Sequence, residues 1–342
     1  MKMSCPASVN DLLYHYTSES GLQGIIESDR IWATHIRFLN DYTEFRQAFR
    51  DKYVEAFVDA FREGMRKDID HLAASVIGGV LAKRNHSVIL ETIEGSAARN
   101  ETFVCSFTSS LQDGFDPGDR LSQWRGYSHS SQGFSLGFEK DALQKQVAID
   151  ERGAKASVLE CIYEDTGAEF SFFREMGHNA SLRFNDLWLS GEAVPDSFPT
   201  NIPAASDEYM KASFYFLKAL SKATAEFFTN AARIKHSGFR EEREWRIVRH
   251  ASHDALKRSG LTKFRKGQSG ETPYIEIPLG LAKPESSPLR RIVVGPGSHK
   301  DDIKCWVELL LERHGVRVRR GHSPDIENGV EVSTSAIPYR SA

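Results

Sequence analysis

The sequence has no apolar run near the roughly 18 residues that a membrane-spanning helix requires. The first ten residues, MKMSCPASVN, lack the apolar centre of a secretory signal. No internal repeat is visible either. These absences predict a cytoplasmic protein with no membrane partner.

Cysteine is scarce, and its distribution excludes a zinc site of the usual kind. None of the four cysteines belongs to a CxxC pair: Cys5, Cys105, Cys161 and Cys305. We therefore expect reduced thiols and no metal. Neither acidic nor basic residues are in large excess, because the formal net charge is only −3. This balance excludes a uniformly basic, nucleic-acid-coating surface but is compatible with a local basic patch.

Core-forming residues are plentiful. The chain of 342 residues is 40% hydrophobic and has 21 Phe, enough for two ordinary domains or one domain with insertions. Phe134, Leu136 and Phe138 alternate with small residues, which predicts a strand. Related patterns predict further strands at 12–14, 30–36, 101–109, 157–163, 243–249, 272–279, 289–295 and 316–321.

Helices are predicted where apolar residues recur every three or four positions. An aromatic stripe with four-residue spacing predicts helices within 42–93: Phe45, Phe49, Tyr53, Phe57 and Phe61. Helices are also predicted at 207–234 and 299–315. Residues 165–206 are poorly periodic. The segment SGEAVPDSFPTNIPAASDE, with its three prolines, predicts a long loop. Because strands outnumber helices and do not alternate with them, the predicted class is α+β.

Three stretches carry polar groups that a plain core does not need. They are HYTS at 15–18, LSQWRGYSHSSQGF at 121–134 and GFREEREWRIV at 238–248. Each has an ordinary explanation alone: a hydrogen-bonded strand end, aromatic cover for the core, and a solvated charged turn. Their joint occurrence indicates a binding site.

The third stretch suggests the chemistry of that site. If it is a strand, Glu242, Glu244 and Arg246 share one face, and the two carboxylates lie about 7 Å apart. Carboxylates beside a ribose stabilise an oxocarbenium-like transition state. The imidazole of His15 can donate to a ribose hydroxyl, and a neighbouring aromatic ring can stack on a base. These residues predict a nucleoside-binding site.

The same stretches carry a family resemblance. LLYHYTS with GLQGIIESDRIWATHIRFLNDYTEF, CSFTSS with LSQWRGYSHSSQGFSLGF, and FREEREWRIV with RRIVVGPG resemble a widespread bacterial family catalogued as a domain of unknown function. Through its His-Tyr-Thr opening and late glutamate-bearing strand, that family is similar to the ADP-ribosyltransferase superfamily. The resemblance implies an α+β fold in which a split β-sheet binds NAD, as substrate, in a central cleft.

The resemblance also implies a domain layout. Residues 1–45 and 99–342 would form the ADP-ribosyltransferase-like catalytic core, 46–98 a helical insertion and 165–206 a loop-rich insertion. The helical insertion would pack outside the sheet. Its aromatic stripe would also suit a homodimer or an antitoxin partner.

Residue roles follow from the resemblance. His15 would bond a ribose of NAD, and Tyr16 and Thr17 would line the cleft. Glu244 would bind the nicotinamide ribose and stabilise the cation as nicotinamide departs. Glu242 would orient the acceptor.

The middle motif departs from the familiar patterns of the superfamily. Trp124, Arg125 and Tyr127 are therefore our assignments for nicotinamide stacking and phosphate pairing, since arginine offers a bidentate fork to a phosphate. Glu241 competes with Glu242 for the role of second carboxylate.

The acceptor of ADP-ribose stays open. Lys and Arg outnumber Asp and Glu from 233 to 266, and RVRRGH follows at 317–322. A basic rim suits a nucleic-acid or acidic protein acceptor, although a basic face that balances acidic helices explains it equally well. The resemblance implies a bacterial toxin or anti-phage effector. The alternatives are an NAD hydrolase, with water as acceptor, and a non-catalytic nucleotide-sensing module.

Overall fold

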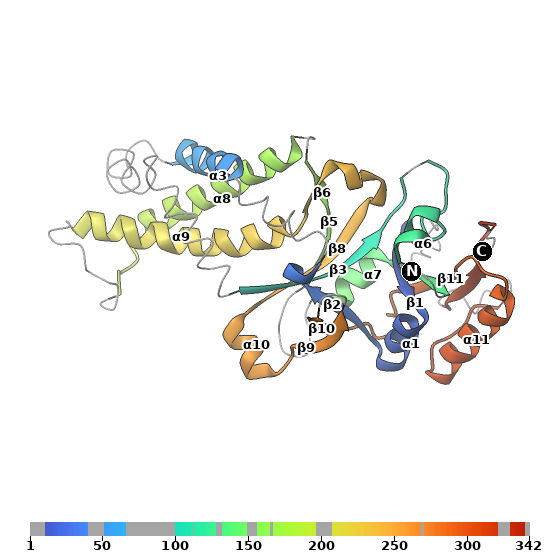
Figure 1. The fold of residues 1–342 in the computed structure, drawn as a ribbon. Helices are drawn as coiled ribbons and strands as arrows, with labels where there is room; N and C mark the ends of the chain where they lie inside the picture. Colours follow the sequence, from blue (N-terminus) through green and yellow to red (C-terminus); the bar gives the residue numbers. More distant parts are fainter. Residues whose placement is uncertain are drawn as a thin grey trace, which may run out of the picture.

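The computed structural model describes residues 11–39, 51–65, 100–111, 113–127, 132–148, 156–164, 167–195, 207–267, 270–320 and 329–338. They form a mixed α+β fold in two parts, a large sheet with helices packed on it and an arm of three helices that projects from it (Figure 1). Each part has its own hydrophobic core.

The described sheet has ten strands and is mostly antiparallel. The strands are β1 (Leu12–Ser18), β2 (Arg30–His35), β3 (Asn100–Thr108), β4 (Gly133–Glu139), β5 (Ala156–Glu160), β8 (Glu244–Ser252), β9 (Lys263–Gly267), β10 (Gly270–Pro278), β11 (Leu289–Val294) and β12 (Glu331–Thr334). Their main order is β12-β11-β4-β1-β3-β2-β10-β9, and the β11–β12 pair is parallel. A separate parallel pair joins β6 (Ile162–Tyr163) to β7 (Ile234–Lys235).

The sheet forks at β3. One edge of β3 pairs with β8 along its whole length, and β5 pairs with the far edge of β8. The other edge is shared, because β1 pairs with it at Thr108 and β2 pairs with it at Phe103 and Val104. From this point one branch continues through β4, β11 and β12, and the other through β10 and β9.

Four helices cover one face of the sheet: α1 (Glu19–Ser28), α7 (Lys140–Val147), α10 (His253–Ser259) and α11 (Lys300–Arg313). Phe134, Leu136 and Phe138 are fully buried beneath them, which confirms the strand predicted from their alternation. Helix α1 begins after Ser18, whose Oγ accepts a hydrogen bond from the Gly21 amide at 3.3 Å.

The opposite face is covered at β1 by α6 (Leu121–Tyr127), where Tyr14, Tyr16 and Trp124 belong to one buried cluster. Two 3₁₀ helices join the strands of the sheet to their neighbours: η2 (Ile36–Phe38) follows β2, and η3 (Ser237–Glu242) precedes β8.

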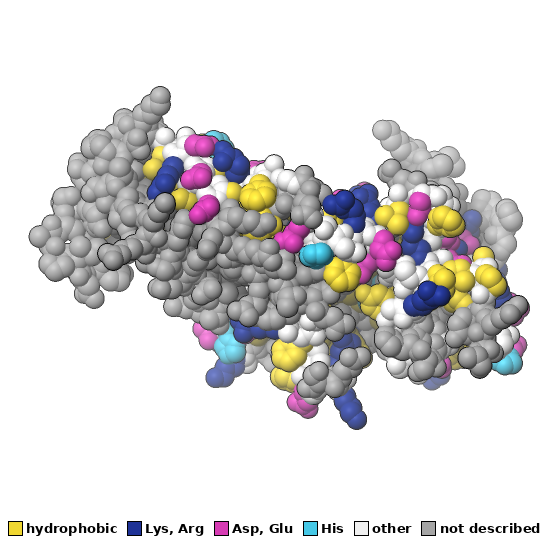
Figure 2. All heavy atoms as spheres, turned by 45° about the horizontal axis from the view of Figure 1, so that its top comes forward, with side chains coloured by type: hydrophobic (Ala, Val, Ile, Leu, Met, Phe, Trp, Pro, Cys, Tyr) yellow, Lys and Arg dark blue, Asp and Glu magenta, His cyan; other side chains and the backbone are white. Residues whose placement is uncertain are grey.

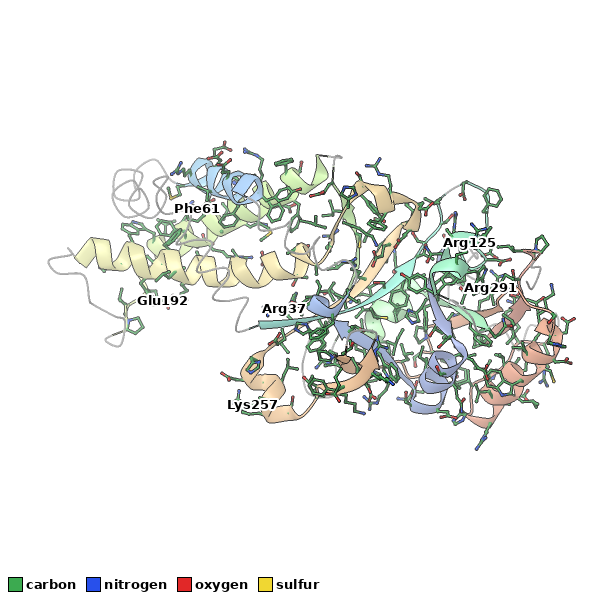
Figure 3. All side chains as sticks on the ribbon, in the orientation of Figure 1. Arg37, Phe61, Arg125, Glu192, Lys257 and Arg291 are labelled. Carbon is green, nitrogen blue, oxygen red and sulfur yellow. The ribbon has the colours of Figure 1, made fainter. Side chains whose placement is uncertain are left out.

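The helical arm consists of α3 (Asp51–Gly64), α8 (Ala168–Ser190) and α9 (Asp207–Ala231). Its core is rich in aromatic side chains, among them Tyr53, Phe61, Phe184 and Tyr215; Figure 3 labels Phe61. Helices α3 and α8 approach closely, because a Cβ added to Gly177 would lie only 2.1 Å from the carbonyl oxygen of Phe57.

Some element predictions need correction. Residues 168–190, predicted to belong to a loop-rich insertion without clear periodicity, form α8. Its buried face shows the three- and four-residue spacing of a helix through Phe173, Met176, Ala180 and Phe184. No strand forms over 316–320; instead Val318 makes a single bridge with Val330. Within the predicted helical insertion 46–98, the described residues form α3, which packs on α8 as expected of a helix outside the sheet. Its other residues lie outside the described ranges.

Among the described residues, no helix combines the length and the apolar character needed to cross a membrane.

Candidate functional site

The strand that contains HYTS and the strand that begins at Glu244 both pair with β3 at the fork of the sheet. Thr108 of β3 lies directly opposite Tyr14 of β1 on one side and Glu244 of β8 on the other. Residues directly opposite each other on neighbouring strands share a face. Tyr14, Thr108 and Glu244 therefore form a row across one face of the sheet. The polar groups at the start of β8 lie at the Glu244 end of this row.

Glu244 lies in a buried cluster of charges. Arg246 donates to one carboxylate oxygen from Nε at 2.7 Å and to the other from its second terminal nitrogen at 3.1 Å. Lys235 of β7 donates to the second oxygen at 2.5 Å. The backbone amide of Glu244 donates to the hydroxyl of Tyr163 at 2.9 Å. Only 3% of Glu244 is exposed, and both of its carboxylate oxygens accept hydrogen bonds from these two cations.

The two cations determine the ionisation of this carboxyl. Burial acts to raise the pKa of Glu244, but Arg246 and Lys235 outweigh that effect and lower it to about 2. Glu244 is therefore a fixed negative charge over the physiological pH range. Arg246 and Lys235 separate its carboxylate from any ligand.

Glu242 is the more accessible of the two predicted carboxylates. The prediction that it shares a strand with Glu244 is wrong, because Glu242 ends η3 and Arg243, with φ of +40°, turns the chain before β8 begins. Its side chain is 23% exposed, and its Oε2 accepts from Nζ of Lys235 at 2.9 Å. The hydroxyl of Thr108 also donates to the Glu242 carbonyl. A single lysine thus connects two glutamates that lie on different elements.

His15 fills the fork of the sheet instead of facing Glu244. Its Nδ1 donates to the carbonyl oxygen of Ser106 at 3.0 Å, on the stretch of β3 between its β1 and β2 partners. The His15 ring lies 5.6 Å from that of Phe107, and its Nδ1 lies 3.7 Å from Sγ of Cys105. Burial lowers the pKa of His15, so the imidazole is neutral at pH 7. Because Phe107 and Cys105 belong to the core on the other face, β3 separates His15 from Glu244.

Tyr16 and Trp124 come together, but they pack on each other. Their rings meet edge to face with centroids 4.7 Å apart. The Tyr16 hydroxyl donates to the carbonyl of Pro117 at 2.8 Å, and the indole nitrogen of Trp124 donates to Asp119 at 2.8 Å. Both side chains are buried with their polar atoms bonded inside the protein. They form a wall of the fold and leave no open ring for a base to stack on.

The remaining predicted ligand residues point in different directions. Thr17 packs against α1, where a Cβ on Gly21 would lie 2.0 Å from its hydroxyl oxygen. Arg125 and Tyr127 lie on the exposed side of α6, and Figure 3 labels Arg125 near Arg291 at that end of the molecule.

A pocket of about 780 Å³ opens where β8 begins. Lys140 places its ammonium nitrogen 5.0 Å from the ring of Trp245 there, and Nε of Arg243 is buried without a hydrogen-bond partner. The lining residues are Asp11, Leu12, Leu13, Ser109, Ser110, Gly114, Glu139, Lys140, Asp141, Glu160, Arg243 and Trp245. None of the predicted site residues lines this pocket, so the expected convergence on one cleft is not found among the described residues.

Two important residues were missed from the sequence. Lys235 carries no distinctive local signal, because it stands in the mixed stretch ARIKHSG and meets its carboxylates only through the pairing of β6 with β7 and the turn at η3. Trp245 could have been found, since strand alternation places it on the face opposite Glu244.

No metal site is evident: across the ranges that the structure describes, no three His, Cys, Asp or Glu side chains are placed to share an ion. The fold and the site define an α+β protein with a forked sheet and a buried charge cluster at the start of β8. Residues 123–247 match the model of a family described as a protein of unknown function (DUF2971). That range includes Lys235, Glu242 and Glu244. Searches of curated proteins and of solved structures each found no match.

Proposed function

We propose that this protein is an NAD-dependent ADP-ribosyltransferase with a split-sheet core, and that NAD binds where η3 turns into β8. The observation that carries the proposal is the double contact of Lys235, which holds Glu242 and Glu244 at one point while leaving Glu242 partly accessible. The fork of the sheet beside the His-Tyr-Thr strand supports the architecture.

The pocket offers partners for the parts of NAD. The ring of Trp245 can stack on a flat heterocycle once the Lys140 ammonium moves aside. Arg243 lines the pocket and suits a pyrophosphate, which arginine binds through its planar fork. These two residues take the roles that the sequence alone assigned to Trp124 and Arg125.

Glu242 and Glu244 have different roles in the proposed reaction. The bond between the nicotinamide nitrogen and the ribose carbon breaks, its electron pair leaves with nicotinamide, and positive charge develops on the ribose. We assign Glu242 to stabilise that charge, because its side chain is 23% exposed and it directly precedes Arg243, which lines the pocket. Glu244, already paired with two cations, fixes the position of Lys235. A nucleophilic oxygen or nitrogen of the acceptor then bonds to the same carbon and loses its proton.

The test is nicotinamide release from NAD by the full chain, together with labelling of RNA, DNA and protein acceptors. We expect Glu242→Gln to lower the rate by about a hundred- to a thousandfold, the usual effect of removing one such electrostatic group. NAD affinity should change little, because the ground-state ribose is neutral. Glu241→Gln is the matched control, since Glu241 is the exposed neighbour on the same 3₁₀ helix and should keep its activity.

Two results would redirect the proposal. Nicotinamide release without labelling of any acceptor would make the protein an NAD hydrolase with the same residues. Binding of NAD without release would make it a nucleotide-sensing module, a role that the fully paired state of Glu244 favours. If the chain neither binds NAD nor releases nicotinamide, the proposal is wrong.

A further inference from the structure

A surface rich in cations and aromatic rings lies at the end of the branch that contains β2, β10 and β9. We call it the β9 surface, and its residues come from η2, α10 and β9: Arg37, Phe38, Lys257, Arg258, Lys263, Phe264, Arg265 and Lys266. Residues 253–267 hold five Lys or Arg and one Asp, in a chain whose formal net charge is −3. The segment is therefore a local basic region in an otherwise balanced protein.

Side-chain contacts hold these segments next to one another. Glu101 of β3 accepts from Nε2 of His35, next to η2, at 2.6 Å and from Nδ1 of His253, at the start of α10, at 3.1 Å. Arg265 of β9 donates to the hydroxyl of Thr34 on β2 at 2.9 Å. Figure 3 places Arg37 and Lys257 at the same end of the sheet, and Figure 2 shows Lys and Arg side chains protruding along the lower edge of the molecule.

The aromatic rings of this surface are unusually open. Phe264 is 60% exposed and Phe38 is 53% exposed, and each stands next to an arginine or lysine in the sequence. Strand β9 ends the order of the described sheet, so its side chains lie at the edge of the sheet. Arg265 itself lies over the rings of Trp32 and Tyr274, 5.3 and 5.9 Å from their centroids.

We infer that the β9 surface binds single-stranded nucleic acid. Exposed rings interleaved with cations match what an unpaired strand offers, since bases stack on the rings while Lys and Arg contact the phosphates. A duplex would engage the cations alone, because its bases are already stacked on each other. An acidic protein would likewise need the charges but not Phe264 and Phe38. The inference does not depend on NAD turnover and is tested without NAD.

The experiment is fluorescence anisotropy with the full chain and labelled 12-nucleotide RNA and DNA single strands of mixed sequence, and with the matching duplex. We expect single strands to bind more tightly than the duplex. Phe264→Ala should weaken single-strand binding by about 5- to 150-fold, the range typical for loss of one stacked base. Replacing Lys257, Arg258 and Lys266 with Gln together should weaken binding and flatten its salt dependence by roughly 0.7 per lost phosphate contact.

Matched controls come from the other end of the molecule. Phe115→Ala removes a ring that is 68% exposed, and Lys304→Gln removes a half-buried cation of α11; both should leave affinity unchanged. Circular dichroism checks that each variant is folded. The inference is overturned if single strands do not bind, if Phe115→Ala weakens binding as much as Phe264→Ala, or if the duplex or heparin binds as tightly as single strands and Phe264→Ala changes nothing.

Discussion

Lys235 balances two carboxylates, of which Glu244 is buried away from water. Its side chain is 2% exposed, and it contacts Glu242 and Glu244 at once. Removing one member of a buried ion pair leaves an uncompensated charge in a medium of low polarity, which costs far more than losing an exposed pair. The stability of this corner of the fold therefore depends on one lysine.

We predict that Lys235→Met lowers the free energy of unfolding by about 3–5 kcal/mol. The control is Lys218→Met, which breaks the exposed pair of Lys218 with Glu192 on the arm and should cost less than about 1 kcal/mol. Urea unfolding at pH 7 measures both values. Equal losses in the two variants would show that the Lys235 cluster is not a stabilising centre.

The same cluster predicts an acid-labile contribution to stability. The pKa of Glu244 falls from its usual 4.5 to about 2 on folding, so the unfolded state binds a proton first as pH drops. The stabilisation, roughly 3 kcal/mol, is present above pH 4.5 and is lost as pH falls from about 4.5 towards 2. We expect urea unfolding between pH 5 and pH 2.5 to show a shallower pH dependence for Glu244→Gln than for the unaltered chain. Parallel curves would contradict the assignment.

At the scale of elements, the approach of α3 to α8 depends on a glycine. A Cβ on Gly177 would lie 2.1 Å from the carbonyl oxygen of Phe57 and 3.1 Å from the amide nitrogen of Phe61. Backbone atoms cannot move aside as a flexible side chain can. The two helices must separate if any side chain is introduced there.

We predict that Gly177→Ala destabilises the arm by about 1–3 kcal/mol, the usual cost of overpacking. Gly126→Ala in α6 is the control, because no heavy atom lies within 4 Å of its added Cβ; it should be neutral or slightly stabilising. Hydrogen exchange should speed up in α3 and α8 in the first variant while β3 and β8 stay protected. Uniform acceleration across the chain would contradict a local effect.

Local pattern predicted most strands of the sheet but not β9 or β12, and it failed where long-range contacts decide. The β4 prediction held because its alternation is strict and its apolar side chains are fully buried. Helix α8 was missed although Phe173, Met176, Ala180 and Phe184 have helical spacing, because Gly177 and the polar residues around it weaken the pattern. That glycine is required by the neighbouring helix, which no local window reveals. Similarly, Arg243 turns the chain before β8 and removes Glu242 from the strand that alternation alone would extend.

At the scale of the whole molecule, the charge cluster connects the arm to the sheet. Helix α9 ends at Ala231, and a terminal nitrogen of Arg246 on β8 donates to the carbonyl of Ala232 just beyond it at 2.8 Å. Lys235 follows on β7 and reaches the start of β8. The arm therefore joins the Glu244 face of the sheet through buried polar contacts and through a small apolar cluster of Ile36, Val104, Ala232 and Val248 (Figure 1). The sequence indicated a β-rich core and helices outside it, but this junction depends on residues far apart in the chain.

The position of β3 at the fork has a consequence for biosynthesis. Its partner β8 pairs along its whole length, yet the chain between Thr108 and Glu244 contains α6, β4, α7, β5, α8 and α9. Domains fold largely in the order in which they leave the ribosome. One full edge of β3 therefore stays unpaired while all of those segments emerge, and an open strand edge invites pairing with other chains. The arm is complete, with its own apolar core, before β8 emerges, so the nascent protein passes through a stage in which a folded arm is tethered to an unfinished sheet.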